Sequence, residues 1–174
     1  MEYIRPGLRI RYGLGNVKDD DKRGFLRGLY YRLRDTFRDR FITLAVFGSV
    51  GRGDDDKYSD LDILIIIDFD DISYARERVI EIIHSLKIEN QYLFDIDLYL
   101  LDTRGAKRFR MIYLDMTSDT IIIHDRDNTF RGILSRVVEK LRELGSIKIV
   151  EGDSWYWILK PDIRPGEEVS FDIK

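Results

Sequence analysis

Two aspartates stand two positions apart at the start of a strongly hydrophobic run. Asp60 and Asp62 precede residues 63–67, a run of isoleucine and leucine that is typical of a buried strand. Because alternate residues of a strand point to the same face, both carboxylates are expected on one face, roughly 7 Å apart along the backbone. Two like charges on a buried strand are costly unless a cation neutralises them. The pair therefore favours a metal site, although a capping or solvent-exposed role stays open.

A glycine-rich turn precedes this acidic strand and can supply a phosphate site. Gly48 follows a hydrophobic run and permits unusual backbone dihedrals and the close approach of a ligand. Backbone N–H groups and the Ser49 hydroxyl can hold phosphate oxygens, and Arg52 adds positive charge. The segment has neither the Gly-Lys-Ser/Thr of a Walker A loop nor the glycine pattern of a dinucleotide fingerprint. A phosphate site of another kind is expected here.

Composition and charge narrow the class of protein. The chain has 174 residues, no cysteine and two histidines, which excludes disulfides and thiolate metal sites and favours a hard cation such as Mg²⁺. Residues 1–45 hold eleven Lys/Arg against six Asp/Glu, whereas residues 54–102 hold four against fourteen. This asymmetry fits either a cation site beside a polyanion-facing surface or two solvated faces.

The same composition gives expectations about location and source. No apolar run is long enough to span a membrane, and the N-terminus has no signal-peptide core, so a cytoplasmic protein is expected. Arginine outnumbers lysine and amide side chains are few, which favours a thermophilic source.

Hydrophobic periodicity predicts an α/β (α+β) domain, with a small mixed β-sheet flanked by helices and followed by a C-terminal helix and a β-rich tail. The domain is expected over residues 1–127, and the helix and tail, residues 128–174, are expected to pack on it. Strands are predicted at 8–12, 42–47, 61–67, 92–101, 120–124, 147–150, 155–159 and 169–173. Helices are predicted from a cap at 19–21 to residue 40, at 73–87, at 103–116, and from an Asn128 cap to residue 144.

The motif residues resemble the signature of the DNA polymerase β-like nucleotidyltransferase superfamily, which is Gly-Ser, a spacer, and Asp-x-Asp flanked by hydrophobic residues. Ten residues separate Ser49 from Asp60, a spacing similar to that of the minimal nucleotidyltransferases of archaea and bacteria. The resemblance covers roughly residues 25–125 and implies the nucleotidyltransferase fold. Some of these relatives are partnered with HEPN-domain proteins, so such a partner is a further expectation.

The resemblance also implies a set of metal ligands. Two divalent ions are expected, normally Mg²⁺ with Mn²⁺ able to substitute, held by Asp60, Asp62 and a third carboxylate on a neighbouring strand. Asp95 and Asp97 both lie on the polar face of the predicted strand 92–101. Asp97 is favoured because it lies deeper in that strand, and Asp95 stays open as a supporting or solvated group.

The implied reaction is the transfer of a nucleoside monophosphate, AMP from ATP, to a hydroxyl acceptor with release of pyrophosphate. Gly48, Ser49 and Arg52 would bind the nucleotide phosphates. The acceptor could be a protein hydroxyl, a small molecule or an RNA end. Two other functions stay open, an antitoxin-like protein that binds a HEPN-type toxin and a nucleotide sensor without catalysis.

Several other features have simpler expectations. The acidic run 54–56 is expected to be a solvated loop, with a lid role as the alternative. Lys22 is placed on the polar side of the helix that begins near residue 20. Trp155 and Trp157 are expected to pack in the core or at an oligomer contact, with stacking on a base or acceptor as the alternative. The alternating strands at both ends of the chain are pairing edges that could form a homo-oligomer.

Overall fold

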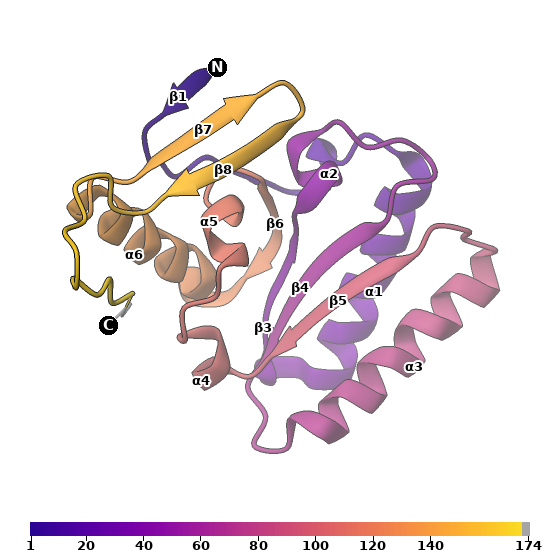
Figure 1. The fold of residues 1–174 in the computed structure, drawn as a ribbon. Coiled ribbons are helices and arrows are strands. Elements are labelled where there is room, and N and C mark those ends of the chain that lie inside the picture. The colour runs from indigo at the N-terminus through magenta and orange to yellow at the C-terminus, as the bar shows by residue number, and fades with distance from the viewer. Residues whose placement is uncertain (172–174) are drawn as a thin grey trace.

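The structure is a computed structural model, and it describes residues 1–171 (Figure 1). Its strands are β1 (Glu2–Ile4), β2 (Ile10–Tyr12), β3 (Phe41–Val46), β4 (Leu61–Ile67), β5 (Ile96–Leu101), β6 (Thr120–Asp125), β7 (Ile147–Glu151) and β8 (Ser154–Ile158). Its α-helices are α1 (Asp20–Phe37), α2 (Gly48–Arg52), α3 (Ile72–Asn90), α4 (Thr103–Ala106), α5 (Ile112–Met116) and α6 (Thr129–Glu143). No helix among these is long and apolar enough to cross a membrane.

A five-stranded mixed sheet forms the centre of the molecule, with the strand order β2-β6-β3-β4-β5. Strand β3 is antiparallel to both β4 and β6, whereas β4 and β5 run parallel. Helices α1 and α3 cover one face, and α5 and α6 pack on the other (Figure 1). The predicted α+β fold with a small mixed sheet is confirmed.

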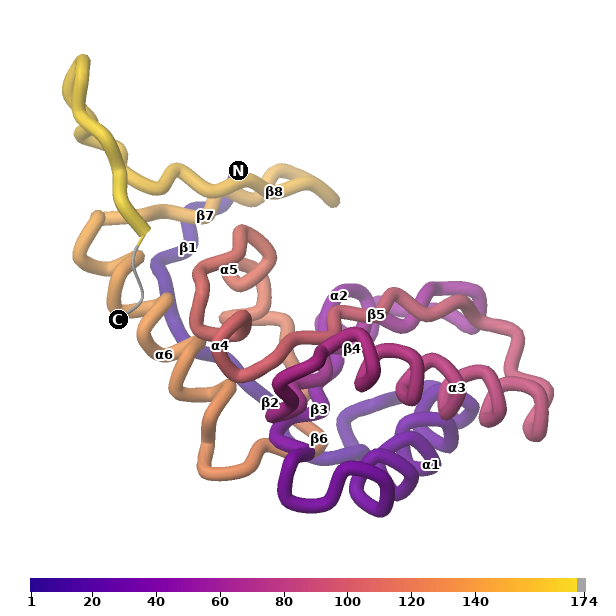
Figure 2. The backbone as a smooth tube through the Cα atoms, turned by 90° about the horizontal axis from the view of Figure 1, so that it is seen from below, coloured from indigo at the N-terminus to yellow at the C-terminus, as the bar shows by residue number. Residues whose placement is uncertain are grey.

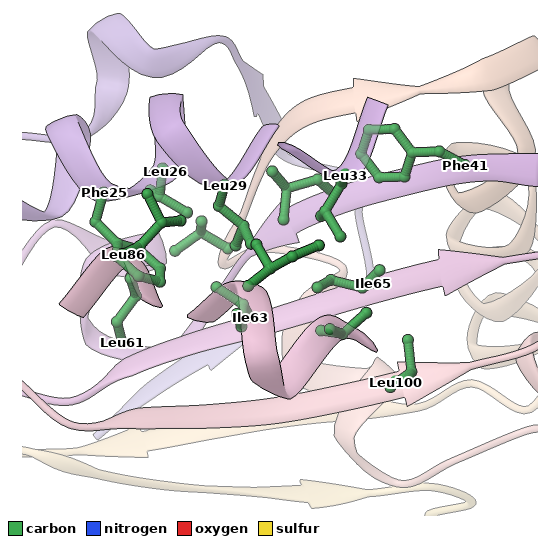
Figure 3. Close-up of a cluster of buried hydrophobic side chains, with 14 of the residues drawn as sticks. Phe25, Leu26, Leu29, Leu33, Phe41, Leu61, Ile63, Ile65, Leu86 and Leu100 are labelled. Atoms are coloured by element: carbon green, nitrogen blue, oxygen red, sulfur yellow. The ribbon is translucent and has the colours of Figure 1, made fainter. Parts of the chain in front are cut away.

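Strand β4 is hydrophobic on both sides because each of its faces lies against helices. Ile63 and Ile65 pack with Leu29 and other residues of α1 in one core cluster (Figure 3). Leu64 and Ile66 belong to the second cluster, with residues of α5 and α6. The run of isoleucine and leucine therefore makes β4 a central strand, as the sequence predicted, and its first residues emerge from the core next to the acidic pair.

A second, antiparallel sheet joins the two ends of the chain, in the order β1-β7-β8. Figure 2 shows it on the far side of the molecule from α1 and α3. The short strand β1 was not predicted. Its pairing with β7 links the first residues to the C-terminal segment, and the division at residue 128 stays a prediction.

Five predicted features differ from the structure in extent or type. The turn at 48–53 forms the short helix α2. The predicted strand 92–101 begins only at Ile96, because Tyr92 and Phe94 pack edge-on against Phe25 of α1. The predicted helix 103–116 divides into α4 and α5, and the buried hydroxyl of Tyr113 donates to the carbonyl of Ala106 at 2.9 Å across the break.

The last two differences concern the C-terminal part. The side chain of Asn128 does not cap α6, because the Asp125 carboxylate accepts from the N–H groups of Phe130 and Arg131 at 2.9 Å each. Residues 169–171 form no strand, and the rest of the predicted strand 169–173 lies outside the described residues.

Candidate active site

Three aspartates meet where β4 and β5 emerge from the core. Asp62 is the second residue of β4, and the parallel pairing of the two strands sets it in register with Asp97 of β5. Asp60 lies immediately before β4 and is exposed, as is Asp97, whereas Asp62 is half-buried. Burial raises the pKa of the Asp62 carboxyl, and the negative charges of Asp97 and Asp60 raise it further. The structure thus places the three carboxylates that the sequence singled out within range of one another's charge.

Asp95, the alternative third carboxylate, has a different environment. Its side chain is 88% exposed, and its carboxylate lies 3.6 Å from the ammonium of Lys87. Its backbone carbonyl accepts from the N–H of Leu61 at 2.8 Å, so Asp95 lies just outside the β4–β5 ladder. The carboxylates that raise the pKa of Asp62 are Asp97 and Asp60, which favours Asp97 as the third acid.

The glycine of the Gly-Ser pair is required by its contact with Asp62. Gly48 has a φ of 63°, a left-handed conformation that glycine adopts without strain. A Cβ atom at this position would lie 2.0 Å from Oδ2 of Asp62. The start of α2, and Ser49 with it, therefore lies directly against the acidic cluster. No side chain among the described residues caps this end of α2.

Arg52, the third predicted phosphate ligand, lies at the other end of α2. Its Nε donates to the Asp54 carboxylate at 3.0 Å, and its guanidinium lies over the ring of Trp155, 4.9 Å from the centroid. Its charge still lowers the pKa of Asp62, against the effects of burial and of the neighbouring acids. Arg52 therefore acts on the acidic cluster through its charge, while its contacts are with Asp54 and with Trp155 of β8.

The loop that leads into Asp60 is anchored by a buried ion pair that sequence reasoning missed. Lys22 of α1 is 0% exposed, and its ammonium lies 3.0 Å from the carboxylate of Asp55, whose side chain is 2% exposed. The same ammonium donates to the carbonyl of Asp56 at 2.6 Å. The prediction of a solvated run at 54–56 is wrong for Asp55, and the polar-side placement of Lys22 is wrong as well. The signal was present, since Lys22 lies three residues before Phe25 on the buried stripe of α1.

Asp56 then shapes the last turn before the acidic pair. Its carboxylate accepts from the backbone N–H groups of Tyr58 and Ser59, at 2.8 Å each, and from the Ser59 hydroxyl at 3.0 Å. These hydrogen bonds, the one from Tyr58 first, lower the pKa of the Asp56 carboxyl. Asp60 thus follows a turn that is held by side chains at both of its ends.

The donor set at the cluster fits a hard divalent cation. It consists of carboxylates alone, which Mg²⁺ and Mn²⁺ accept as ligands. The half-buried position of Asp62 and its two acidic neighbours make its charge costly, and a bound cation would relieve that cost. As the side chains of residues 1–171 stand, no three acidic or histidine groups are close enough together to enclose an ion. Ion binding therefore requires these carboxylates to turn toward one another.

A mixed sheet that presents three carboxylates beside a Gly-Ser helix matches the arrangement that the sequence resemblance led us to expect. The family model described as the nucleotidyltransferase domain matches residues 31–160. The chain belongs to this nucleotidyltransferase family.

A curated relative and three solved structures are among the proteins to which the chain is similar. A protein of Methanocaldococcus jannaschii, named "Putative protein adenylyltransferase MJ1305", is 27% identical over 150 residues, which cover 82% of this chain and 92% of that protein. A crystal structure of a toxin-antitoxin with AMP-PNP is 18% identical and covers 68% of this chain and 87% of its own, with a TM-score of 0.49. The toxin-antitoxin MntA-HepT is 16% identical, covering 69% and 86%, with a TM-score of 0.45. Spectinomycin adenyltransferase AAD(9) from Enterococcus faecialis, with ATP and spectinomycin, is 21% identical, covering 51% and 37%, with a TM-score of 0.42.

Proposed function

We propose that this chain is a Mg²⁺-dependent enzyme that transfers AMP from ATP to a hydroxyl acceptor and releases pyrophosphate. The observation that carries the proposal is the register of β4 and β5, which sets Asp62 beside Asp97 while Asp60 adds a third negative charge. Membership of the nucleotidyltransferase family supports the reaction class. The name of the M. jannaschii relative supports AMP as the transferred group and a protein as the acceptor.

In the proposed reaction the acceptor oxygen bonds to the α-phosphorus of ATP, and the bond from that phosphorus to the bridging oxygen breaks. Asp97 accepts the hydroxyl proton or orients the hydroxyl, and Ser49 donates to the phosphate oxygens. Asp60, Asp62 and Asp97 would hold the divalent ions, which when bound offset the charge of the triphosphate and of the departing pyrophosphate. Positioning and electrostatic stabilisation supply the catalysis, so no nucleophilic side chain is needed.

The deciding experiment is a double substitution of the acidic pair. Asp60→Ala with Asp62→Ala should abolish Mg²⁺-dependent release of labelled pyrophosphate while the circular dichroism spectrum is retained. A matched control is Asp68→Ala with Asp70→Ala, because these two exposed aspartates also stand two positions apart but follow the opposite end of β4. The control should keep full activity. Transfer by the Asp60/Asp62 variant at the parental rate would refute the proposal.

A second experiment addresses the acceptor. The purified protein is incubated with ATP labelled in the adenine ring, Mg²⁺ and a cell lysate, and the products are separated into protein, RNA and small-molecule fractions. Label in the protein fraction that is absent with the Asp60/Asp62 variant would support a protein hydroxyl. A HEPN-domain partner, a homo-oligomer, the cytoplasmic location and the thermophilic source remain predictions.

A further inference from the structure

A pocket of about 250 Å³ lies between α2 and the small β1-β7-β8 sheet. Arg52 at the end of α2, Trp155 and Trp157 of β8, and Asp119 just before β6 all line it. Because β4 and β6 flank β3 on opposite sides, Asp119 and Asp62 lie on opposite flanks of α2. The pocket therefore lies next to the acidic cluster, and the charge of Arg52 lowers the pKa of both Asp62 and Asp119.

Asp119 lines the pocket and has one buried carboxylate oxygen that lacks a hydrogen-bond donor. The residue is 8% exposed, and within the described part of the chain its Oδ2 atom is buried with no hydrogen-bond partner. Nη1 of Arg52 stays 4.0 Å from it, beyond hydrogen-bond length. Burial raises the pKa of this carboxyl, whereas the charge of Lys148, a hydrogen bond with the Ser118 side chain and the charge of Arg52 lower it. An orphaned buried acceptor is costly, so a ligand with an N–H donor would be bound favourably here.

The two tryptophans give the pocket a rigid aromatic wall. The indole N–H groups of Trp155 and Trp157 donate to the same carboxylate oxygen of Asp115, at 2.9 and 3.1 Å. The ammonium of Lys148 lies 3.2 Å from that oxygen and 4.9 Å from the Trp155 ring centroid. These contacts hold both rings in place, and Arg52 also lies over the ring of Trp155. A flat ring of a ligand can pack at little entropic cost against the parts of the two indoles that line the pocket beside these cations.

The rim of the pocket carries positive charge that the fold does not neutralise. Arg5 and Arg9 line the pocket and are exposed, and neither forms an ion pair within residues 1–171. Arg52 and Lys148 also line the pocket but are already paired, with the carboxylates of Asp54 and Asp115, so the uncompensated charge is that of Arg5 and Arg9. This excess suits a phosphate dianion better than a singly charged carboxylate.

We propose that this pocket binds a nucleoside monophosphate whose base carries an exocyclic amino group. The amino group donates to Oδ2 of Asp119, the base lies against the indole rings, and the phosphate contacts Arg5 and Arg9. Binding of this kind requires neither Mg²⁺ nor nucleotidyl transfer, so the proposal stands apart from the enzymatic function proposed above.

The chain contains two tryptophans, and both line this pocket, so intrinsic tryptophan fluorescence reports directly on its occupancy. The full-length protein is titrated in EDTA with AMP, with IMP, in which an oxo group replaces the amino group, and with inorganic phosphate. AMP should give a saturable change. IMP should bind about tenfold to a hundredfold more weakly, because it offers Asp119 no donor at that position. Phosphate alone should give no saturable change at the concentrations at which AMP saturates.

Variants separate this pocket from the acidic cluster. Asp119→Asn should remove the preference for AMP over IMP, since an amide can both donate and accept. Arg9→Ala, at an exposed position that does not threaten the fold, should weaken AMP binding about tenfold, whereas Arg27→Ala, an exposed arginine of α1, should not.

The Asp60/Asp62 double variant should keep the AMP response, so a failure of the enzymatic proposal and a failure of this one are distinguishable. The proposal is overturned if AMP gives no saturable response, if AMP and IMP bind equally well, or if the response disappears in that double variant.

Discussion

The buried ion pair between Lys22 and Asp55 offers a sharp test of how the loop before Asp60 is held. Lys22→Met keeps an unbranched side chain of similar length but removes the charge. The carboxylate of Asp55, whose side chain is 2% exposed, would then be buried without a counter-ion. The carbonyl of Asp56 would also lose its donor at 2.6 Å.

The expected magnitude follows from the burial of both partners. Removing one partner of a buried pair costs about 3–5 kcal/mol, because the other charge stays in the interior uncompensated. For a chain of this size that corresponds to a fall in Tm of roughly 6–20 °C. Adding Asp55→Leu should restore much of this loss, since it removes the stranded charge together with the Oδ1 atom, which has no hydrogen-bond partner.

The assay is urea unfolding followed by circular dichroism, on the parent, both single variants and the double variant. Arg78→Met is the matched control, because its partner Glu81 and Arg78 itself are 62% and 44% exposed. That control should cost under about 1 kcal/mol. The reasoning is refuted if Lys22→Met costs no more than the control, or if the double variant is no more stable than the single Lys22→Met variant.

Three further predictions test other parts of the structure. Asp97→Asn should reduce the transfer of labelled AMP by at least about a hundredfold, whereas Asp95→Asn should leave the transfer intact. If Asp95→Asn lowers the transfer and Asp97→Asn does not, the third carboxylate is Asp95. Gly51→Ala should lower the free energy of unfolding by about 1–3 kcal/mol in thermal unfolding, because the new Cβ would lie 1.8 Å from the backbone oxygen of Asp119. The control Gly132→Ala, whose Cβ would lie in open space within α6, should raise it by about 0.4–1 kcal/mol. Burial raises the pKa of the Asp119 carboxyl in the native state above its value in the unfolded chain. The free energy of unfolding therefore falls as the pH rises above the unfolded-state pKa, because the native state resists ionisation of this group. Denaturant unfolding should therefore show Asp119→Asn gaining stability relative to the parent from about pH 4 to about pH 8, and a relative loss over that range would contradict this sign.

Local sequence patterns determined the centre of the fold. The hydrophobic run of β4 could be identified as a buried strand because a strand covered on both faces needs apolar residues at every position. The Asp19 cap of α1 was readable too, and its side chain accepts from the N–H of Lys22 at 2.8 Å. The Gly-Ser pair and the two aspartates of the acidic strand were recognisable because they lie within one short stretch of chain.

The sequence by itself therefore indicated most of the elements, the family and the candidate acidic residues. Tertiary structure alone decided which partners meet across the fold. The register that sets Asp62 beside Asp97, the pairing of β1 with β7, and the contact between Lys22 and Asp55 each join segments far apart in the chain. Periodicity reports which face of an element is buried, but it does not report what lies opposite that face, because this depends on how distant elements pack.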